Sequence, residues 1–151
     1  MASNYPTILA PIQFNDPNSS VALEMARRLA LDSKGRVFLL HVTPSKSVIP
    51  DLPGYREVYA TDEPSVRREL QKLASENLAD VASEIIVKVG DPAETINLVA
   101  QQIGAQMIVM CTHGRSGLSH FFMGSVAEKV VREAPCMVLT IRPKLLSANG
   151  A

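Results

Sequence analysis

Five short apolar runs, separated by stretches with helical spacing, constrain the fold of this chain more than any other feature. The runs are rich in Ile, Val and Leu and do not alternate with polar residues; they cover residues 7–12, 36–42, 84–89, 106–111 and 136–141. Strands that are covered on both faces have this composition, and they are typical of parallel sheets. The sequence therefore predicts five buried strands.

The segments between these runs carry apolar residues three or four positions apart, as the inner face of a helix does. Capping signals stand where these helices should begin, at Asp16-Pro17, Asp62-Glu63-Pro64, Asp91-Pro92 with Glu94, and Ser125 with Glu128. Gly35 and Gly104 stand where two of the helices should end. Strands that alternate with helices predict a three-layer α/β/α, Rossmann-like fold, with a five-stranded parallel sheet between two layers of helices. Ligands of such sheets bind beyond the carboxyl ends of the strands.

Length and composition fit one globular domain. The chain has 151 residues, 46% of them hydrophobic and 20% charged, and a chain of this size folds around one core. We expect residues 1–143 to form the domain and residues 144–151 to be a flexible tail. The connection at 43–61 is far longer than the usual length of about 2–6 residues. It is either a lid or partner-binding segment, or a tolerated surface insertion.

Charge and cysteine usage argue against several function classes. Fifteen basic residues balance fifteen acidic ones, so the basic excess of a nucleic-acid-binding surface is missing. Cys111 and Cys136 lack the spacing of a zinc site or of a disulfide framework. The sequence contains no run of about 18 apolar residues and no signal-peptide pattern. We therefore expect a cytoplasmic protein that binds neither nucleic acid nor membrane and has no metal site of its own.

Residues 110–126 carry the chemistry that points to a ligand. The segment leaves a predicted strand, passes Gly114 and Gly117 with Arg115 between them, and reaches a predicted helix start at Gly124-Ser125. Glycines let a backbone approach an anion closely, and the first N–H groups of a helix carry partial positive charge. The guanidinium of Arg115 suits phosphate oxygens. These features predict a phosphate-binding loop.

Spacing alone leaves a second interpretation of this segment open. The glycines would then only turn the chain, and Ser125 would only cap the helix, with Glu128 completing a capping box. The segment has neither the Gly-Lys-Ser/Thr of a P-loop nor the glycine fingerprint of dinucleotide-binding folds. No general nucleotide motif therefore decides between the two interpretations.

The same segment resembles the universal stress protein family. Its nucleotide-binding members carry a glycine, two residues, a second glycine, nine residues, and then glycine with Ser or Thr. These four places are occupied here by Cys111, Gly114, Gly124 and Ser125. The resemblance covers roughly residues 5–143, including the first strand and its turn at 8–15 and the stretch 90–110. Two positions depart from the pattern, since Gln13 stands where nucleotide binders usually have Asp, and Cys111 replaces the first glycine.

This resemblance implies an adenine nucleotide such as ATP at the carboxyl edge of the sheet, with Mg²⁺ bound only together with the nucleotide. The base and ribose would lie near Pro11, Ile12, Gln13 and the backbone of Val42. The phosphates would lie on Gly114, Arg115, Ser116, Gly117, Gly124, Ser125 and Val126. The predicted binding set also includes Met110, Cys111 and His113.

The resemblance further implies a regulatory homodimer in stress response that pairs through the carboxyl-terminal strand at 136–141. That strand is apolar and carries few of the charges that protect an exposed edge. No residue set for rapid hydrolysis is evident, because Gln13 replaces a carboxylate and no acidic pair is placed for magnesium and water. The resemblance allows at most a slow ATPase. The alternative function is a nucleotide-free dimeric interaction protein of the same family.

Overall fold

Strands and helices alternate along the chain in the predicted order. The computed structural model describes residues 5–14, 16–45, 63–112 and 123–142. Its elements are β1 (Thr7–Pro11), α1 (Asn18–Ser33), β2 (Arg36–Thr43), α3 (Glu63–Asn77), β3 (Ala82–Val89), α4 (Pro92–Gln102), β4 (Met107–Cys111), α5 (Ser125–Glu133) and β5 (Met137–Ile141). All five predicted strands are confirmed, with ends within two residues of the predicted ones. The tail at 144–151 and most of the connection at 43–61 lie outside the described residues.

The five strands form one parallel sheet in the order β3-β2-β1-β4-β5. In the centre, β1 pairs with β2 on one side and with β4 on the other, so that Ile8 lies between Val37 and Met107. The chain moves outward from β1 through β2 to β3, and then α4 carries it back across β1 to β4. The direction of strand order reverses between β1 and β4. Their carboxyl ends therefore form the topological switch point, where open α/β sheets bind ligands.

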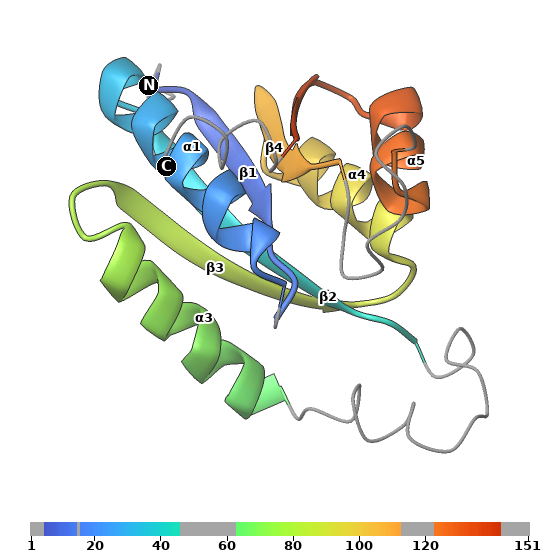
Figure 1. Cartoon of the computed structure of the whole chain (residues 1–151), viewed down its shortest axis with the longest axis horizontal. Coiled ribbons are helices and arrows are strands. Elements are labelled where there is room, and N and C mark those ends of the chain that lie inside the picture. Colours follow the sequence, from blue (N-terminus) through green and yellow to red (C-terminus); the bar gives the residue numbers. More distant parts are fainter. Residues whose placement is uncertain (1–4, 15, 46–62, 113–122, 143–151) are drawn as a thin grey trace.

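The helices cover both faces of the sheet, which confirms the predicted α/β/α layers (Figure 1). On one face, α1 and α3 bury Leu23 and Leu70 against Leu39 of β2. On the other face, α4 and α5 bury Ile96 and Val130 in the core that also contains strand residues such as Leu9, Leu40 and Ile108. Neighbouring strand residues point to opposite faces, so each apolar strand contributes to both cores at once. This explains why the strands read as continuous apolar runs.

The helix start at α4 has a side-chain cap as predicted. Asp91 caps α4, where its carboxylate accepts from the N–H of Glu94 at 3.0 Å and Pro92 is the first helical residue. At α1 the predicted start is wrong by one residue, because Pro17 occupies the N-cap and no side chain among the described residues caps the helix. Asp16 lies one residue earlier, and its carboxylate accepts from the N–H of Asn18 at 2.9 Å.

The predicted cap of α5 at Ser125 is wrong by one residue. Gly124 occupies the N-cap, with φ −59° and ψ 151°, and Ser125 is the first helical residue. The carbonyl of Gly124 accepts from the N–H of Glu128 at 2.9 Å, while no side chain among the described residues caps the helix. The spacing of Ser125 and Glu128 matches a capping box, but the box needs the serine outside the helix.

The end of α1 shows why glycine stands at position 35. Lys34 takes the left-handed conformation, with φ 55°, and the N–H of Gly35 donates to the carbonyl of Ala30 at 2.8 Å. A Cβ on Gly35 would lie only 2.5 Å from the carbonyl oxygen of Pro6. The chain can therefore turn from α1 into β2 only with a residue that lacks a side chain. At the end of α4, Gly104 is itself left-handed, with φ 64°.

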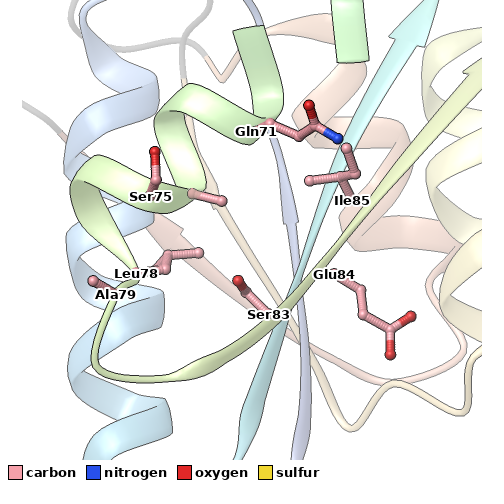
Figure 2. A pocket seen from close by; sticks show the side chains of 8 residues that line it. Gln71, Ser75, Leu78, Ala79, Ser83, Glu84 and Ile85 are labelled. Carbon is pink, nitrogen blue, oxygen red and sulfur yellow. The ribbon is translucent and has the colours of Figure 1, made fainter. Parts of the chain in front are cut away.

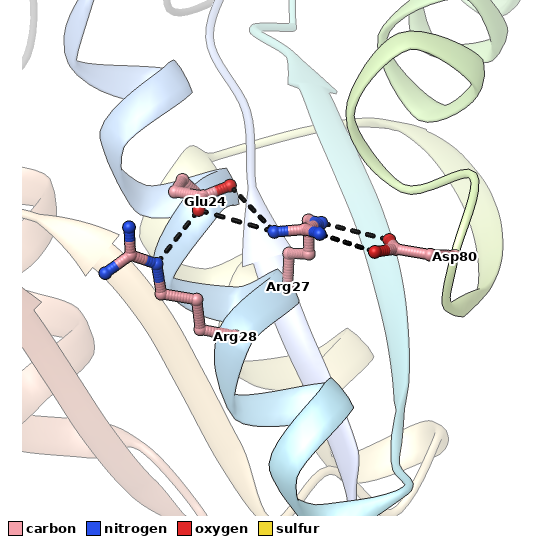
Figure 3. A network of polar contacts seen from close by, with 4 residues as sticks. All are labelled: Glu24, Arg27, Arg28 and Asp80. Carbon is pink, nitrogen blue, oxygen red and sulfur yellow. Dashed lines mark hydrogen bonds and ion pairs between the residues drawn. The ribbon is translucent and has the colours of Figure 1, made fainter.

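A surface ion network joins α1 to the turn before β3 (Figure 3). Arg27 donates from Nε to Asp80 at 2.9 Å and makes a second, shorter bond to the same carboxylate from Nη2. Glu24 accepts from Arg28 at 2.9 Å and also lies near Arg27. The bond from Arg27 lowers the pKa of Asp80. Because these groups are exposed, the network orients the turn and adds little stability.

Candidate functional site

Two helices begin at the switch point, next to the carboxyl ends of β1 and β4. After β1, the chain turns through Gln13 into α1, and after β4 it leads to Gly124 at the start of α5. A direct contact joins the two sides, because the thiol of Cys111 in β4 lies 3.1 Å from the carbonyl of Asn18 in α1. This contact joins Cys111, a predicted site residue, to a residue that stands 93 positions earlier in the sequence.

At the end of β1, backbone groups of Ile12 and Gln13 form hydrogen bonds within the protein. The hydroxyl of Ser19 accepts from the N–H of Gln13 at 3.1 Å and donates to the carbonyl of the same residue at 3.0 Å. The N–H of Ile12 donates to the carbonyl of Leu40 at 2.7 Å. The Gln13 side chain is exposed, and among the described residues its amide has no hydrogen-bond partner. This amide is therefore a polar group that could meet a ligand at the strand end.

A buried histidine, His41, adds a further hydrogen bond at the end of β1. The Nδ1 atom of His41 in β2 lies 3.0 Å from the carbonyl oxygen of Ile12, and the imidazole ring packs on Phe14 with ring centroids 4.4 Å apart. Burial lowers the pKa of His41, although the bond to Ile12 acts in the opposite direction. A neutral ring that donates from Nδ1 fits this arrangement. The ring therefore contributes a hydrogen bond to the main chain at the end of β1.

The β4 side is closed by backbone bonds and by the hydroxyl of Thr112, which donates to the carbonyl of Ile141 at 3.3 Å. The N–H of Thr112 donates to the carbonyl of Ile141 at 2.9 Å, and the carbonyl of Thr112 accepts from the N–H of Gly124 at 2.6 Å. The second bond brings the two ends of the glycine segment together at the carboxyl edge. Ser125 and Val126, in the first turn of α5, are both exposed. The positive end of the α5 dipole therefore faces this edge.

Cys111 does not project toward the start of α5. Its side chain packs into the core between the sheet and α1, and the thiol approaches the carbonyl of Asn18. Burial raises the pKa of Cys111 to about 11, with a smaller contribution from the negative charge of Asp16. The thiol is neutral at pH 7 and acts as a weak donor. The side chain that replaces the first motif glycine thus occupies the α1 face of β4.

The other predicted site residues that the structure describes lie on different faces of the sheet. Met110 and Val42 pack in the core beneath α4 and α5, whereas Ile12 packs beneath α1, and Pro11 is half-buried at the end of β1. Of the predicted set, His113, Gly114, Arg115, Ser116 and Gly117 lie outside the described residues. The sequence analysis missed Ser19 and Phe14. A signal for Ser19 exists, since a serine in the first turn of a predicted helix often bonds to the preceding turn.

Comparison with known proteins decides the family. The model of the universal stress protein family matches residues 4–142, nearly the whole chain. The chain belongs to the universal stress protein family. Universal stress protein MJ0577 of Methanocaldococcus jannaschii is 25% identical over 95% of this chain and 99% of its own length. Universal stress protein G of Escherichia coli O157:H7 is 30% identical over 91% of this chain and 99% of its own length.

Solved structures of universal stress proteins share this fold. The structure of MJ0577 aligns with a TM-score of 0.75 at 24% identity and covers 91% of this chain and 96% of that chain. A universal stress protein in complex with cAMP aligns at 0.67, with 20% identity over 93% and 99% of the two chains. The protein from Archaeoglobus fulgidus in complex with dAMP aligns at 0.65, with 19% identity over 91% and 98%.

This universal stress protein also has a groove away from the switch point (Figure 2). The groove has a volume of about 550 Å³ and lies between the last turns of α3 and the beginning of β3, with Ala74 and Leu78 on one wall and Ile85 on the other. Its polar rim carries Gln71 and Glu84. The rim carries one carboxylate and no basic side chain, so its chemistry does not suit a phosphate.

Proposed function

We propose that this protein is an adenine-nucleotide-binding regulatory protein of the cytoplasmic stress response. One observation carries the proposal: the bond from Gly124 to Thr112 sets the start of α5 beside the carboxyl end of β4, next to the switch point. Helix starts bind phosphate through their N–H groups, and no side chain among the described residues caps this one. The phosphates would lie on Gly124, Ser125 and Val126, together with the glycine residues that precede them.

The nucleoside half of the ligand would lie at the end of β1. Gln13 is exposed there, and its amide both donates and accepts hydrogen bonds. Support comes from the universal stress proteins that were solved with cAMP and with dAMP, which have the same fold. Among the described residues no three His, Cys, Asp or Glu side chains gather as metal ligands. Mg²⁺ would therefore arrive with the phosphates of the nucleotide.

A thermal-shift titration tests the proposal. ATP, ADP, AMP and cAMP are added separately, and the melting temperature is followed to millimolar concentration. A ligand that binds only the native protein adds about 2.7 kcal/mol of stability at 100 times its dissociation constant. We expect at least one adenine nucleotide to raise the melting temperature in a saturable manner. The absence of a shift with all four would contradict the proposal.

We also propose that the protein acts as a homodimer that pairs through β5. This strand is an edge of the sheet, its five residues carry no charge, and Met137 is 63% exposed. Such an edge offers unpaired backbone groups and apolar side chains to a second copy. Met137→Lys should give a monomer in light scattering, whereas Leu98→Lys on the exposed side of α4 should not. A wild-type monomer at micromolar concentration would rule this dimer out.

A nucleotide-free dimeric interaction protein is the second candidate. Two observations favour it, namely the neutral side chain of Gln13 and the Cys111 side chain at the first motif position. This function predicts a dimer in light scattering and no response to any nucleotide in the thermal-shift titration. The titration therefore separates the two candidates.

A further inference from the structure

Strand β3 forms the edge of the sheet opposite β5. Among the described residues it pairs only with β2, on one side. The N–H of Gly90, directly after β3, donates to the carbonyl of Thr43 in β2 at 3.0 Å. Backbone groups of successive strand residues point to alternate sides, so those of the odd-numbered residues in 83–89 point away from β2. This edge therefore offers a row of backbone donors and acceptors to another strand.

One face of β3 carries a groove at its start and an exposed apolar side chain at its end. Ile85 and Val87 pack on the core beneath α1 and α3, so Val89 lies on the same face by alternation. Val89 is 70% exposed. The groove between α3 and β3 begins on this face, where Figure 2 shows Ser83 and Ile85 on the α3 side of the strand and Glu84 pointing away.

The other face of β3 carries two exposed side chains of opposite charge, Glu84 and Lys88, with Ile86 midway between them. If a second β3 lies antiparallel with Ile86 opposite its own copy, Glu84 of each strand faces Lys88 of the other. The same register sets Ile85 opposite Val87, so residues with outward backbone groups pair with each other. A shift of the register by two residues would keep such backbone pairs but lose both charge pairs. The strand is thus complementary to itself in one register.

In this register the exposed valine of each copy meets the groove of the other. Residues directly opposite in an antiparallel pair point to the same face, so Val89 of one strand stands beside Ser83 of the second. Ser83 lines the groove, and Ala74 and Leu78 form its apolar wall. The contact occurs twice, because a twofold pair uses the same surface of both copies.

We propose that β3 binds β3 of a second copy of this chain, antiparallel about Ile86, with Glu84 facing Lys88 on one face and Val89 at the groove on the other. Charges on an edge strand often protect it from pairing. Here they would repel a strand of like charge and attract a second copy. The proposal does not depend on nucleotide binding.

This contact is separate from the proposed dimer through β5. Since β3 and β5 are opposite edges of the sheet, the β3 contact would join β5 dimers end to end. It covers only one short strand of each copy, so we expect a dissociation constant on the order of 0.1–1 mM. The β3 contact therefore adds to the β5 dimer only at high protein concentration.

Sedimentation equilibrium at millimolar protein concentration tests the proposal. Met137→Lys serves as the parent chain, because it removes pairing through β5, and we expect it to form dimers under these conditions. Glu84→Lys and Lys88→Glu, each added to this parent, place like charges opposite each other and should lower the association constant about tenfold or more. Glu69→Lys makes the same charge change at an exposed residue of α3 and should leave association unchanged.

The charge-swapped double variant Glu84→Lys with Lys88→Glu is the decisive control. It has the net charge of the parent and restores both facing pairs, so its association should return to the level of the parent. Circular dichroism checks that each variant folds. The proposal fails if the parent stays monomeric, if either single reversal associates as strongly as the parent, or if the double variant does not recover. A monomeric parent would leave an extended segment of another protein as the occupant of this edge.

Discussion

The two sides of the switch point are built differently. At the end of β1, side chains from α1 and β2 satisfy the backbone, through the hydroxyl of Ser19 and the imidazole of His41. At the end of β4, two backbone bonds and one bond from the hydroxyl of Thr112 join the strand end to β5 and to Gly124, and α5 begins there without a side-chain cap among the described residues. A ligand would thus meet a side chain on one side and backbone N–H groups on the other. This difference predicts that substitutions on the two sides have different effects.

The largest effect is expected at Gly124. Gly124→Val should lower nucleotide affinity at least about 100-fold, because a branched side chain would stand where phosphate approaches the helix start. The φ of Gly124 is −59°, which other residues adopt easily, so the fold should survive. Calorimetry measures the affinity, and circular dichroism checks the fold. Gly124→Ala is the matched control and should lose less affinity; equal affinity in the wild type and Gly124→Val would show that phosphate does not lie here.

On the β1 side, we expect Ser19→Ala to act mainly on stability. The substitution leaves the N–H and the carbonyl of Gln13 without this partner, and such a loss costs about 1 kcal/mol. Urea denaturation measures the free energy of unfolding. Ser20→Ala is a suitable control, since Ser20 lies next in α1 and donates to the preceding Pro17 instead. If both variants unfolded at the same urea concentration, the two hydrogen bonds between Ser19 and Gln13 would not contribute to stability.

His41 should make the β1 side sensitive to pH. Burial lowers its pKa in the folded protein, whereas the unfolded chain has a pKa of about 6.5. Below that pH the unfolded chain takes up a proton that the folded protein does not, so stability should fall as the pH falls from 7 to 5. His41→Asn can keep a donor toward Ile12 and cannot titrate, and its stability should depend less on pH. Urea denaturation at pH 5, 6 and 7 measures this, and parallel curves for both proteins would refute it.

The smallest effect on stability is expected at Ser125. Since Gly124 and not Ser125 is the N-cap, Ser125→Ala should change the free energy of unfolding by no more than about 0.5 kcal/mol. The same substitution should weaken nucleotide binding modestly if its hydroxyl contacts phosphate. Thermal melts with and without ATP give both quantities. A loss of about 1 kcal/mol or more without ATP would indicate that Ser125 caps the helix after all.

The fold was predictable because burial on both faces leaves a strong signal in the sequence. The exception is informative: β3 begins at Ala82, two residues before the apolar run at 84–89. Ala82 and Ser83 are held by pairing with Arg36 and Val37 of β2, a backbone effect that side-chain composition does not reveal. The start of α5 was misplaced by one residue for a related reason, because a capping pattern does not specify which residue lies outside the helix.

The candidate site was predictable only in its location. The alternation of strands and helices locates a switch point, and the glycine segment points to its β4 side. The two hydrogen bonds between Ser19 and Gln13 depend on how α1 packs on the sheet. That packing involves contacts between residues far apart in the sequence, such as Asn18 with Cys111. No local pattern contains that information. The set of nucleotide-contacting residues therefore stays a prediction.

Amide chemical shifts in an NMR titration with ATP test the central claim most directly, because they report where the ligand lies. The account predicts the largest changes at Gly124, Ser125 and Gln13, on the two sides of the switch point. It predicts little change in the groove between α3 and β3, at Gln71 and Ser83. Saturable changes confined to that groove, or none at all up to millimolar ATP, would contradict the claim.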